Sequence, residues 1–397
     1  MNRSGSRSSE KTPLRDGANI STSGVRIMAS MEEAETGNPE GLRNSDHDHE
    51  RPGYRLCAYV ERFIETDAGQ VPVISHRLTK GDLVSTFLVR CGINRHRYTV
   101  APGLYAVGNP DKSSEVLVTA NFKLTFDHLR KELDGVNAWI LVLDTNGVNV
   151  WCAAGKGTFS TRELVKRIRL SSVEKIVGHK KVIVPQLGAT GVSARQVKKQ
   201  SGFTVVYGPI RAEDIPAFLR NGNRADKSMR EVTFTMYERL ILTPVEIQIA
   251  LKPALLTALA LLIISGFGPG IFSISNAWHR GLVSVFALAA GMFSGLFVTP
   301  VLLPFVPSRV FAVKGIITGT VLAIPALFLL SPAINGIAEF AALFLFSVCV
   351  SSFLAMNFTG TTPFTSPSGV EKEMKRFIPV QLACLVISCG LWIYGAF

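Results

Sequence analysis

Residues 149–157 read Asn149-Val150-Trp151-Cys152-Ala153-Ala154-Gly155-Lys156-Gly157, with a single thiol in the middle. A short apolar run at 139–143 comes before this stretch, and an amphipathic segment at 161–170 comes after it. Ser160 and Glu163 form the capping-box pattern that begins a helix. We therefore expect the stretch to be a loop at the end of a buried strand, which is the edge of an open α/β sheet where ligands bind.

The neighbours of Cys152 suit a large, flat ligand. Trp151 offers an aromatic surface on one side of the thiol, and the small residues 153–155 leave the backbone open on the other side. If the segment is helical, Lys156 lies one turn after Cys152 on the same face. Its positive charge would then favour the thiolate, which is the form that binds metals.

The residues alone leave three roles open for Cys152: a structural thiol, a catalytic nucleophile or a soft metal ligand. A nucleophile lacks an obvious His-and-acid pair, and a zinc site lacks a second ligand at the usual spacing, because Cys57 and Cys91 are isolated. A phosphate loop is excluded because its pattern needs a glycine five residues before Gly155, and the nearest one is Gly147. A single thiolate can still bind a metal that a cofactor holds.

Composition divides the chain into a polar extension, a soluble part and a membrane part. The 397 residues predict two domains, and 47% apolar with only 18% charged residues favours a membrane protein. Residues 1–51 are polar and charged, so we expect a disordered extension, and it has no apolar core of signal-peptide length. The net charge of +12 does not indicate nucleic acid, because the basic linker at 223–252 adjoins apolar spans and is expected to anchor at the membrane.

Residues 52–222 show the pattern of a soluble α/β domain. Apolar, strand-like runs occur at 116–120, 139–143, 182–184 and 203–207, and segments with helical spacing lie between them, such as 122–133 and 192–200. This alternation predicts a parallel sheet covered by helices. The glycine fingerprint of a dinucleotide site is absent from the sequence.

Small residues cluster where two of these strands end. We expect them to meet the Cys152 stretch at one edge of the sheet, although ordinary turns between strands and helices have the same composition. These candidate pocket residues are Gly188, Ala189, Thr190, Gly191, Gly208 and Pro209.

After residue 252 the sequence predicts an all-α transmembrane domain at 253–397. Five long, uncharged runs lie near 254–274, 281–303, 315–337, 340–356 and 377–397, each close to the roughly 20 residues that cross a bilayer. Basic residues gather before the first run and in the second and fourth connections, which the positive-inside rule puts in the cytoplasm together with the α/β domain. We place Arg280 in the first connection and Glu339 at a boundary, so the runs themselves carry no charge. The C-terminus is then expected outside.

The Cys152 stretch, extended to Phe159, resembles a signature of the corrinoid proteins of microbial mercury methylation, which are membrane-anchored relatives of the large subunit of the corrinoid iron–sulfur protein. The segments 101–105, 116–127 and 207–212 fit the same family, and the resemblance runs from about Arg55 to the C-terminus. It implies a Rossmann-like, corrinoid-binding α/β domain followed by five transmembrane helices. It also implies that Cys152 is the lower axial ligand of the corrinoid cobalt.

The resemblance implies a methyltransferase that carries a methyl group on cobalt and transfers it to Hg(II). A thiolate donates strongly to cobalt and makes it harder to reduce, so a low-potential electron donor is needed. The family supplies one as a ferredoxin-like partner with two [4Fe–4S] clusters, and takes its methyl group from a folate-dependent methyltransferase. The connection at 359–374 resembles a segment of the corrinoid iron–sulfur protein family and would be a docking surface or an ordinary loop. A corrinoid carrier with another acceptor, and a non-enzymatic membrane protein with a structural Cys152, remain as alternatives.

Overall fold

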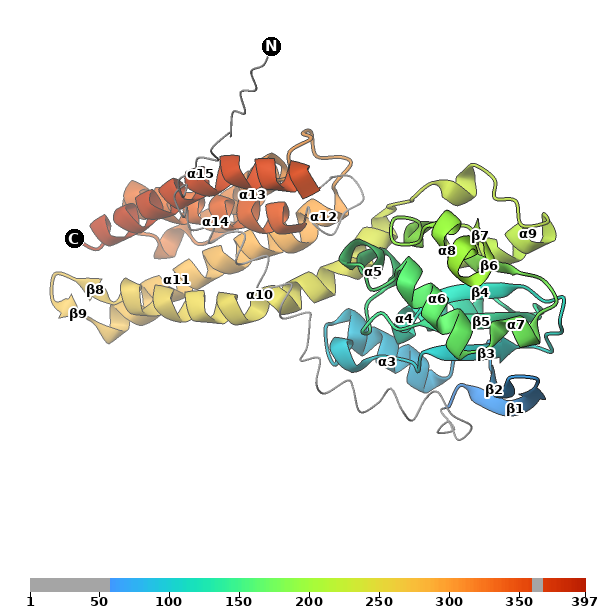
Figure 1. The fold of residues 1–397 in the computed structure, drawn as a ribbon. Helices are drawn as coiled ribbons and strands as arrows, with labels where there is room; N and C mark the ends of the chain where they lie inside the picture. Colours follow the sequence, from blue (N-terminus) through green and yellow to red (C-terminus); the bar gives the residue numbers. More distant parts are fainter. Residues whose placement is uncertain (1–57, 359–366) are drawn as a thin grey trace, which may run out of the picture. The chain divides into compact units, whose positions relative to one another are not determined.

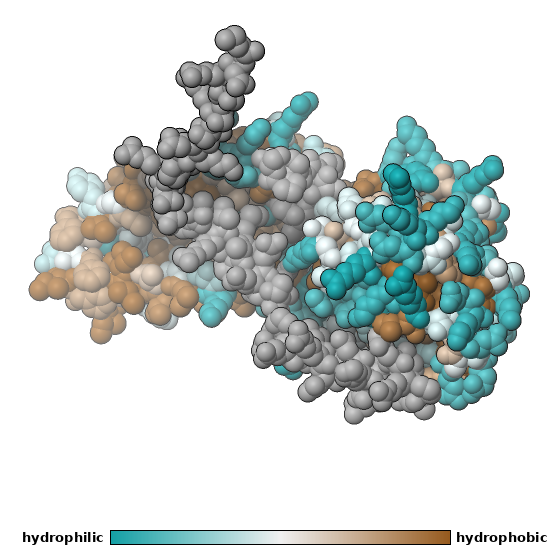
Figure 2. All heavy atoms as spheres, viewed as in Figure 1, coloured by the Kyte–Doolittle hydropathy of each residue, from teal (hydrophilic) through white to brown (hydrophobic). Residues whose placement is uncertain are grey.

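The computed structural model describes residues 58–358 and 367–397 (Figure 1). The extension predicted at 1–51, Cys57 and residues 359–366 of the fourth connection lie outside the described residues. The described residues form an α/β domain and a set of long helices. Figure 2 shows mostly hydrophilic residues over the first and many hydrophobic residues over the second.

The α/β domain is built on a seven-stranded sheet with the order β1-β2-β3-β5-β4-β6-β7. The four predicted strands are confirmed and run parallel to one another. They are β4 (Val116–Ala120), β5 (Ala138–Leu143), β6 (Lys181–Val184) and β7 (Thr204–Tyr207). β4 and β5 are buried along their whole length, as expected for strands with helices on both faces.

The expectation of a wholly parallel sheet is wrong, because three further strands make it mixed. β1 (Val60–Thr66) and β2 (Gly69–Ile74) form an antiparallel hairpin at one edge. β3 (Gly103–Val107) pairs antiparallel with β5, over the register from Gly103 opposite Val142 to Val107 opposite Ala138. β1 has charged, exposed residues between its apolar ones, which is typical of an edge strand.

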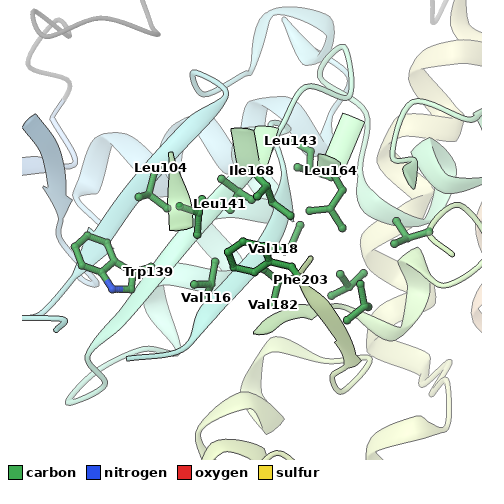
Figure 3. Close-up of a cluster of buried hydrophobic side chains, with 14 of the residues drawn as sticks. Leu104, Val116, Val118, Trp139, Leu141, Leu143, Leu164, Ile168, Val182 and Phe203 are labelled. Atoms are coloured by element: carbon green, nitrogen blue, oxygen red, sulfur yellow. The ribbon is translucent and has the colours of Figure 1, made fainter. Parts of the chain in front are cut away.

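Helices cover both faces of the sheet because successive side chains of each strand point to opposite faces. One core cluster contains Val116, Val118 and Leu141 (Figure 3), together with Leu164 of α6 (Thr161–Leu170) and Val197 of α8 (Ala194–Ser201). The alternate strand residues belong to a second cluster on the other face, with α4 (Lys123–Lys131) and α9 (Ile215–Arg220). The two clusters give the layered arrangement of an α/β domain.

Three buried charges and one partly buried charge join α3 (Lys80–Arg90) to α4. The Lys123 ammonium lies 2.7 Å from one oxygen of Asp82 and 2.6 Å from an oxygen of Asp127. The Arg130 guanidinium bridges the same two carboxylates at 2.9 and 2.7 Å, and it also donates to the backbone oxygens of Ser75 and Arg77. The two positive and two negative charges compensate one another, as a buried cluster requires.

Acid should weaken this cluster through Asp82. Burial raises the pKa of the Asp82 carboxyl, but hydrogen bonds from Lys123 and Thr79 outweigh burial and hold it well below its usual range. A carboxyl with a depressed folded-state pKa stabilises the fold above its unfolded pKa of about 4, and this contribution is lost as the pH falls towards the folded value. In thermal denaturation of the whole chain in detergent, Asp82→Asn should lower the midpoint at pH 7. It should also flatten the decline below about pH 4, and an unchanged acid profile would contradict this account.

Among the described residues, five helices are long and apolar enough to cross a membrane, which confirms the predicted number. They are α10 (Met236–Ser265), a second helix running through α11 (Ile274–Phe293), the π-helical turn η5 (Ser294–Val298) and α12 (Thr299–Val301), then α13 (Phe311–Leu329), α14 (Gly336–Phe358) and α15 (Pro367–Tyr394). The predicted bounds of the first helix are wrong. It begins 18 residues before Ala254, so the last part of the basic segment is helical, and it ends at Ser265 before a hairpin of β8 (Phe267–Gly268) and β9 (Ile271–Phe272).

The prediction that the helical runs carry no charge is also wrong. Arg280 lies inside α11 and Glu339 inside α14, and both are buried. The Arg280 Nε lies 2.7 Å from the Glu339 carboxylate, and the guanidinium donates to the backbone oxygen of Trp392 at 2.6 Å. The pairing explains how two ionised groups are accommodated among apolar helices.

Helix α14 is held by close approach of glycines from two other helices. A Cβ on Gly291 or Gly295 would lie 2.5 or 2.7 Å from the backbone oxygens of Ser347 and Ser351, respectively. Gly315 and Gly319 of α13 come equally close to Ser351. Small residues four apart allow helix backbones to approach in this way, and such packing is the main attraction between helices in lipid.

Candidate functional site

Cys152 lies in the first turn of a short helix, α5 (Val150–Lys156), so the expectation of a loop is wrong. The side chain of Asn149 caps this helix by accepting a hydrogen bond from the Cys152 backbone N–H at 2.9 Å. Gly157 ends the helix in the left-handed conformation, at φ 80°. The helical alternative is therefore the one found, and it puts Lys156 one turn after Cys152 on the same face.

Burial separates α5 into two faces. Val150, Ala153 and Ala154 belong to the core, whereas Trp151 and Cys152 are exposed, with 44% of Trp151 accessible. Residues 155 and 156 are exposed next to them. The thiol and a large aromatic surface thus lie together on the outer face, where a ligand can reach both.

Asn121, at the end of β4, organises the loop before α5, and we did not single it out from the sequence. Its side-chain oxygen accepts from the backbone N–H groups of Thr145 and Gly147 at 3.0 and 2.9 Å. The Thr145 hydroxyl lies 2.8 Å from the same oxygen and 2.6 Å from the Val148 backbone oxygen, and its one proton is shared between these two acceptors. These bonds fix the turn that leads from β5 to Asn149, and an Asn directly after a buried strand is the sequence signal for such a role.

Ser160 and Glu163 do not form the reciprocal capping box that the sequence pattern predicts. Ser160 caps α6 by accepting from the Glu163 backbone N–H at 3.3 Å. The Glu163 carboxylate, however, accepts from the Asp144 backbone N–H at 3.1 Å and pairs with Arg167 at 2.9 Å. The Glu163 carboxylate therefore connects the end of β5 to α6.

The turn after β6 packs directly on the residues that follow α5. A Cβ on Gly191 would lie 2.0 Å from the backbone oxygen of Phe159 and 3.1 Å from the Cα of Ala154. A Cβ on Gly188 would lie 2.5 Å from the Phe159 ring. The Thr161 backbone N–H also donates to the Gly191 oxygen at 3.0 Å. Both glycines are needed for close contact between the two segments.

The candidate pocket residues after β6 and β7 are connected as well, but they differ in exposure. The Gln186 backbone N–H donates to the Pro209 oxygen at 3.4 Å, and the Gly208 N–H donates to Val184 at 2.9 Å. Gly188, Gly208 and Pro209 are buried, whereas Thr190 is exposed. The structure thus brings all three segments to one edge of the sheet, and the exposed part of that edge is formed by α5 and residues 189–191.

The donors of the site suit one soft metal bond rather than a protein-bound ion. The described residues contain no group of three His, Cys, Asp or Glu side chains that could hold a metal by themselves. The Cys152 thiol is a soft ligand on an accessible helix face. Among the described residues, nothing lies within 4 Å of a Cβ built on Gly155 or Gly157. A metal carried by a large, flat cofactor fits this arrangement.

Gly191→Ala should separate the turn after β6 from α5. The added methyl group would lie 2.0 Å from a backbone oxygen, so the segment must shift. We expect the free energy of unfolding to fall by about 1–3 kcal/mol, the usual cost of overpacking. Denaturation of the whole chain in detergent measures this change. Gly155→Ala is the matched control, because its Cβ meets open space within a helix, where Ala is favoured over Gly by about 0.5–1 kcal/mol. Equal stability of the two variants would contradict the packing described here.

Comparisons with known proteins relate the α/β domain to subunits named for acetyl-CoA synthesis and to a corrinoid/iron-sulfur protein. Residues 80–219 match the family model described as CdhD: CO dehydrogenase/acetyl-CoA synthase delta subunit. The acetyl-CoA decarbonylase/synthase complex subunit gamma of Methanocaldococcus jannaschii is 34% identical over 139 residues, which are 34% of this chain and 28% of the relative. The same subunit of Methanopyrus kandleri is 32% identical over 127 residues, which are 32% of this chain and 27% of the relative.

A third relative is the corrinoid/iron-sulfur protein large subunit of Moorella thermoacetica, 29% identical over 119 residues, which are 30% of this chain and 26% of the relative. The chain thus spans about a quarter of the length of these curated relatives. The matched part contains every candidate site residue from Asn149 to Pro209.

Proposed function

We propose that the chain is a membrane-anchored corrinoid protein that transfers a methyl group to Hg(II), giving methylmercury. The observation that carries the proposal is the exposed Cys152 thiol on a capped helix, at the edge where three segments meet. That edge belongs to the part of the chain that is similar to corrinoid proteins. The choice of Hg(II) as acceptor rests on the resemblance of residues 149–159 to the mercury-methylation family.

Each residue of the α5 face has a distinct part in holding the cofactor. The Cys152 thiolate would be the axial ligand of the cobalt, and the positive charge of Lys156 one turn later would favour that thiolate. Trp151 would cover part of the macrocycle with its ring. No described residue lies within 4 Å of a Cβ on Gly155 or Gly157, and the turn at 188–191 would form the adjoining wall.

The axial thiolate also decides which acceptors are suitable. When bound, the corrinoid supplies a cobalt centre that carries the methyl group. A thiolate at Cys152 would donate electron density to the metal that the corrinoid holds, which would suit an electrophilic acceptor. Hg(II) is a soft, thiol-binding electrophile and fits this requirement. A ferredoxin-like protein with two [4Fe–4S] clusters would supply low-potential electrons, and a folate-dependent methyltransferase would supply the methyl group.

The relatives favour one alternative, a corrinoid methyl carrier with another acceptor. Three of them are named for acetyl-CoA synthesis or as corrinoid/iron-sulfur proteins, and none of these names mentions mercury. The two functions share the same thiolate and differ only in the molecule that receives the methyl group. The experiment must therefore identify both the cofactor and the acceptor.

The test uses the full chain, produced with its ferredoxin-like partner in a host that makes corrinoids. The purified protein should show a corrinoid absorption spectrum, and cells given Hg(II) should form methylmercury. A protein without corrinoid would leave Cys152 as a structural thiol. A corrinoid-loaded protein whose labelled methyl group never reaches Hg(II) would favour the alternative carrier.

The proposed location is the cytoplasmic membrane, with the α/β domain in the cytoplasm. Five spans then put the C-terminus outside and the connection before α15 inside. A reporter enzyme fused after Phe397 should be active only outside, and one inserted near Lys372, in the first turns of α15, only inside. Reporters that respond on the same side would show that one helix does not span.

A further inference from the structure

Helix α3 presents an apolar face to the outside of the α/β domain, and the proposed function does not use it. Leu83, Val84 and Phe87 are 57%, 58% and 66% exposed, and Leu88 is 39% exposed. The helix buries Asp82 and Val89 on its opposite side. The exposed residues follow one another at helical spacing, so they form one continuous stripe rather than isolated apolar positions.

Basic residues flank this stripe in the sequence, and the one acidic residue among them is paired. Residues 77–98 contain five Arg and Lys side chains and a single acidic one, Asp82. Asp82 is buried and paired with Lys123 and Arg130, so it offers no negative charge at the surface. The basic residues are Arg77, Lys80, Arg90, Arg95 and Arg97.

The spacing within α3 places charge and apolar groups on the same side. Lys80, Val84 and Phe87 lie at positions i, i+4 and i+7 of the helix. A lysine at the end of an apolar stripe can lay its methylene chain along that surface and hold its ammonium group in the headgroup layer. Apolar groups on one face with cationic groups at its margin are typical of helices that lie in the plane of a membrane surface.

A short connection joins the α/β domain, which contains α3, to the first candidate membrane span. Only residues 231–235 separate the last short helix of the α/β domain, η4 (Ser228–Arg230), from α10, the first of the five candidate spans. A connection this short keeps the domain within tens of ångströms of the lipid, so a weak surface affinity is sufficient for occupancy. Anionic lipids also complement the three exposed basic side chains, Arg77, Lys80 and Arg97.

We propose that α3 lies on the anionic lipid surface of the membrane that the chain's own helices span. Leu83, Val84 and Phe87 insert between the headgroups, and Lys80 and Arg97 bind lipid phosphates. This contact gives the α/β domain a second attachment besides α10. It thereby restricts rotation of the domain on its short connection.

The test uses the full chain in lipid nanodiscs that contain anionic lipid with brominated acyl chains, which quench tryptophan fluorescence at short range. Phe87→Trp adds a reporter on the stripe, and the emission of the unaltered protein with its four tryptophans is subtracted. The matched control is Leu170→Trp, at an equally exposed apolar position that ends α6, since Leu170 is 53% exposed. The added emission should fall by at least half for Trp at 87 and remain unchanged at 170.

A charge-reversal arm tests the electrostatic part with the same reporter. Lys80→Glu with Arg97→Glu should reduce the quenching at position 87 at least twofold, and so should replacement of the anionic lipid by a zwitterionic one. Both changed residues are exposed, so the fold should be preserved. Equal quenching at 87 and 170 would overturn the proposal. A reporter at 87 that is shielded from a water-soluble quencher but not quenched by brominated lipid would assign the stripe to a protein partner instead.

Discussion

Cys152→Ala should abolish methyl transfer and leave the fold intact. The thiol is exposed, so its removal creates no cavity, and Ala is the most favourable residue in a helix. The free energy of unfolding of the variant should therefore stay within about 0.5 kcal/mol of that of the parent protein. Without the axial thiolate, methylmercury formation in cells with the partner present should fall to the background of cells that lack the protein.

Two further substitutions make this experiment specific. Cys91→Ala removes a thiol at the end of α3, away from α5, and should leave methylmercury formation largely unchanged. Cys152→Ser keeps the shape but offers a harder donor, so it should be almost as inactive as Ala and should change the corrinoid spectrum. Full activity of Cys152→Ala would refute the ligand assignment, whatever the other variants show.

The second large effect is expected for the ion pair between α11 and α14. Arg280→Leu leaves the Glu339 carboxylate among apolar helices without its cation, although the backbone N–H of Asn335 still donates to it at 2.8 Å. Breaking one side of a buried pair costs about 3–5 kcal/mol. The Arg280 guanidinium also lies 4.5 Å from the centre of the Trp392 ring, and that contact is lost as well.

A double variant distinguishes the effect of the unpaired Glu339 charge from the loss of the other Arg280 contacts. Arg280→Leu with Glu339→Leu removes both charges and should recover a large part of the stability lost in the single variant, as measured by denaturation in the same detergent. Lys375→Leu is the control, because its pair with Glu371 at 2.6 Å is exposed and contributes about 0–1 kcal/mol. If the double variant is as unstable as the single one, the ion pair is not the reason for the loss.

The sequence predicted the centre of the α/β domain but not its edge. The runs at 116–120 and 139–143 are continuously apolar because these strands are buried on both faces, and that pattern is easy to read. β1 has pairs of charged and of apolar residues without strict alternation, and the apolar run of β2 is only four residues long, so the sequence pattern did not reveal the hairpin. The direction of β3 depends on its long-range pairing with β5, which composition does not encode.

The candidate site shows the same division. Trp151, Cys152 and Lys156 are local to one helix, so spacing alone predicted their common face once the segment was helical. Asn121 lies 24 residues from Thr145, and its role became visible only with the loop folded around it. In the membrane part, Arg280 and Glu339 were excluded from the spans because each charge interrupts an apolar run. Because the two charges pair with each other, neither bears the cost of an unpaired charge among apolar helices, on which that exclusion was based.

The glycine contacts around α14 have a consequence for the order of assembly. During synthesis α11 and α13 enter the membrane before α14, because chains are made from the N-terminus. Until α14 arrives, the face around Gly291 and Gly295 and the face around Gly315 and Gly319 both lack the backbone that they fit. The bundle can therefore close only when the fourth span has been inserted. A chain truncated before Gly336 would leave both faces in lipid, where quality-control proteases and unrelated helices compete for them.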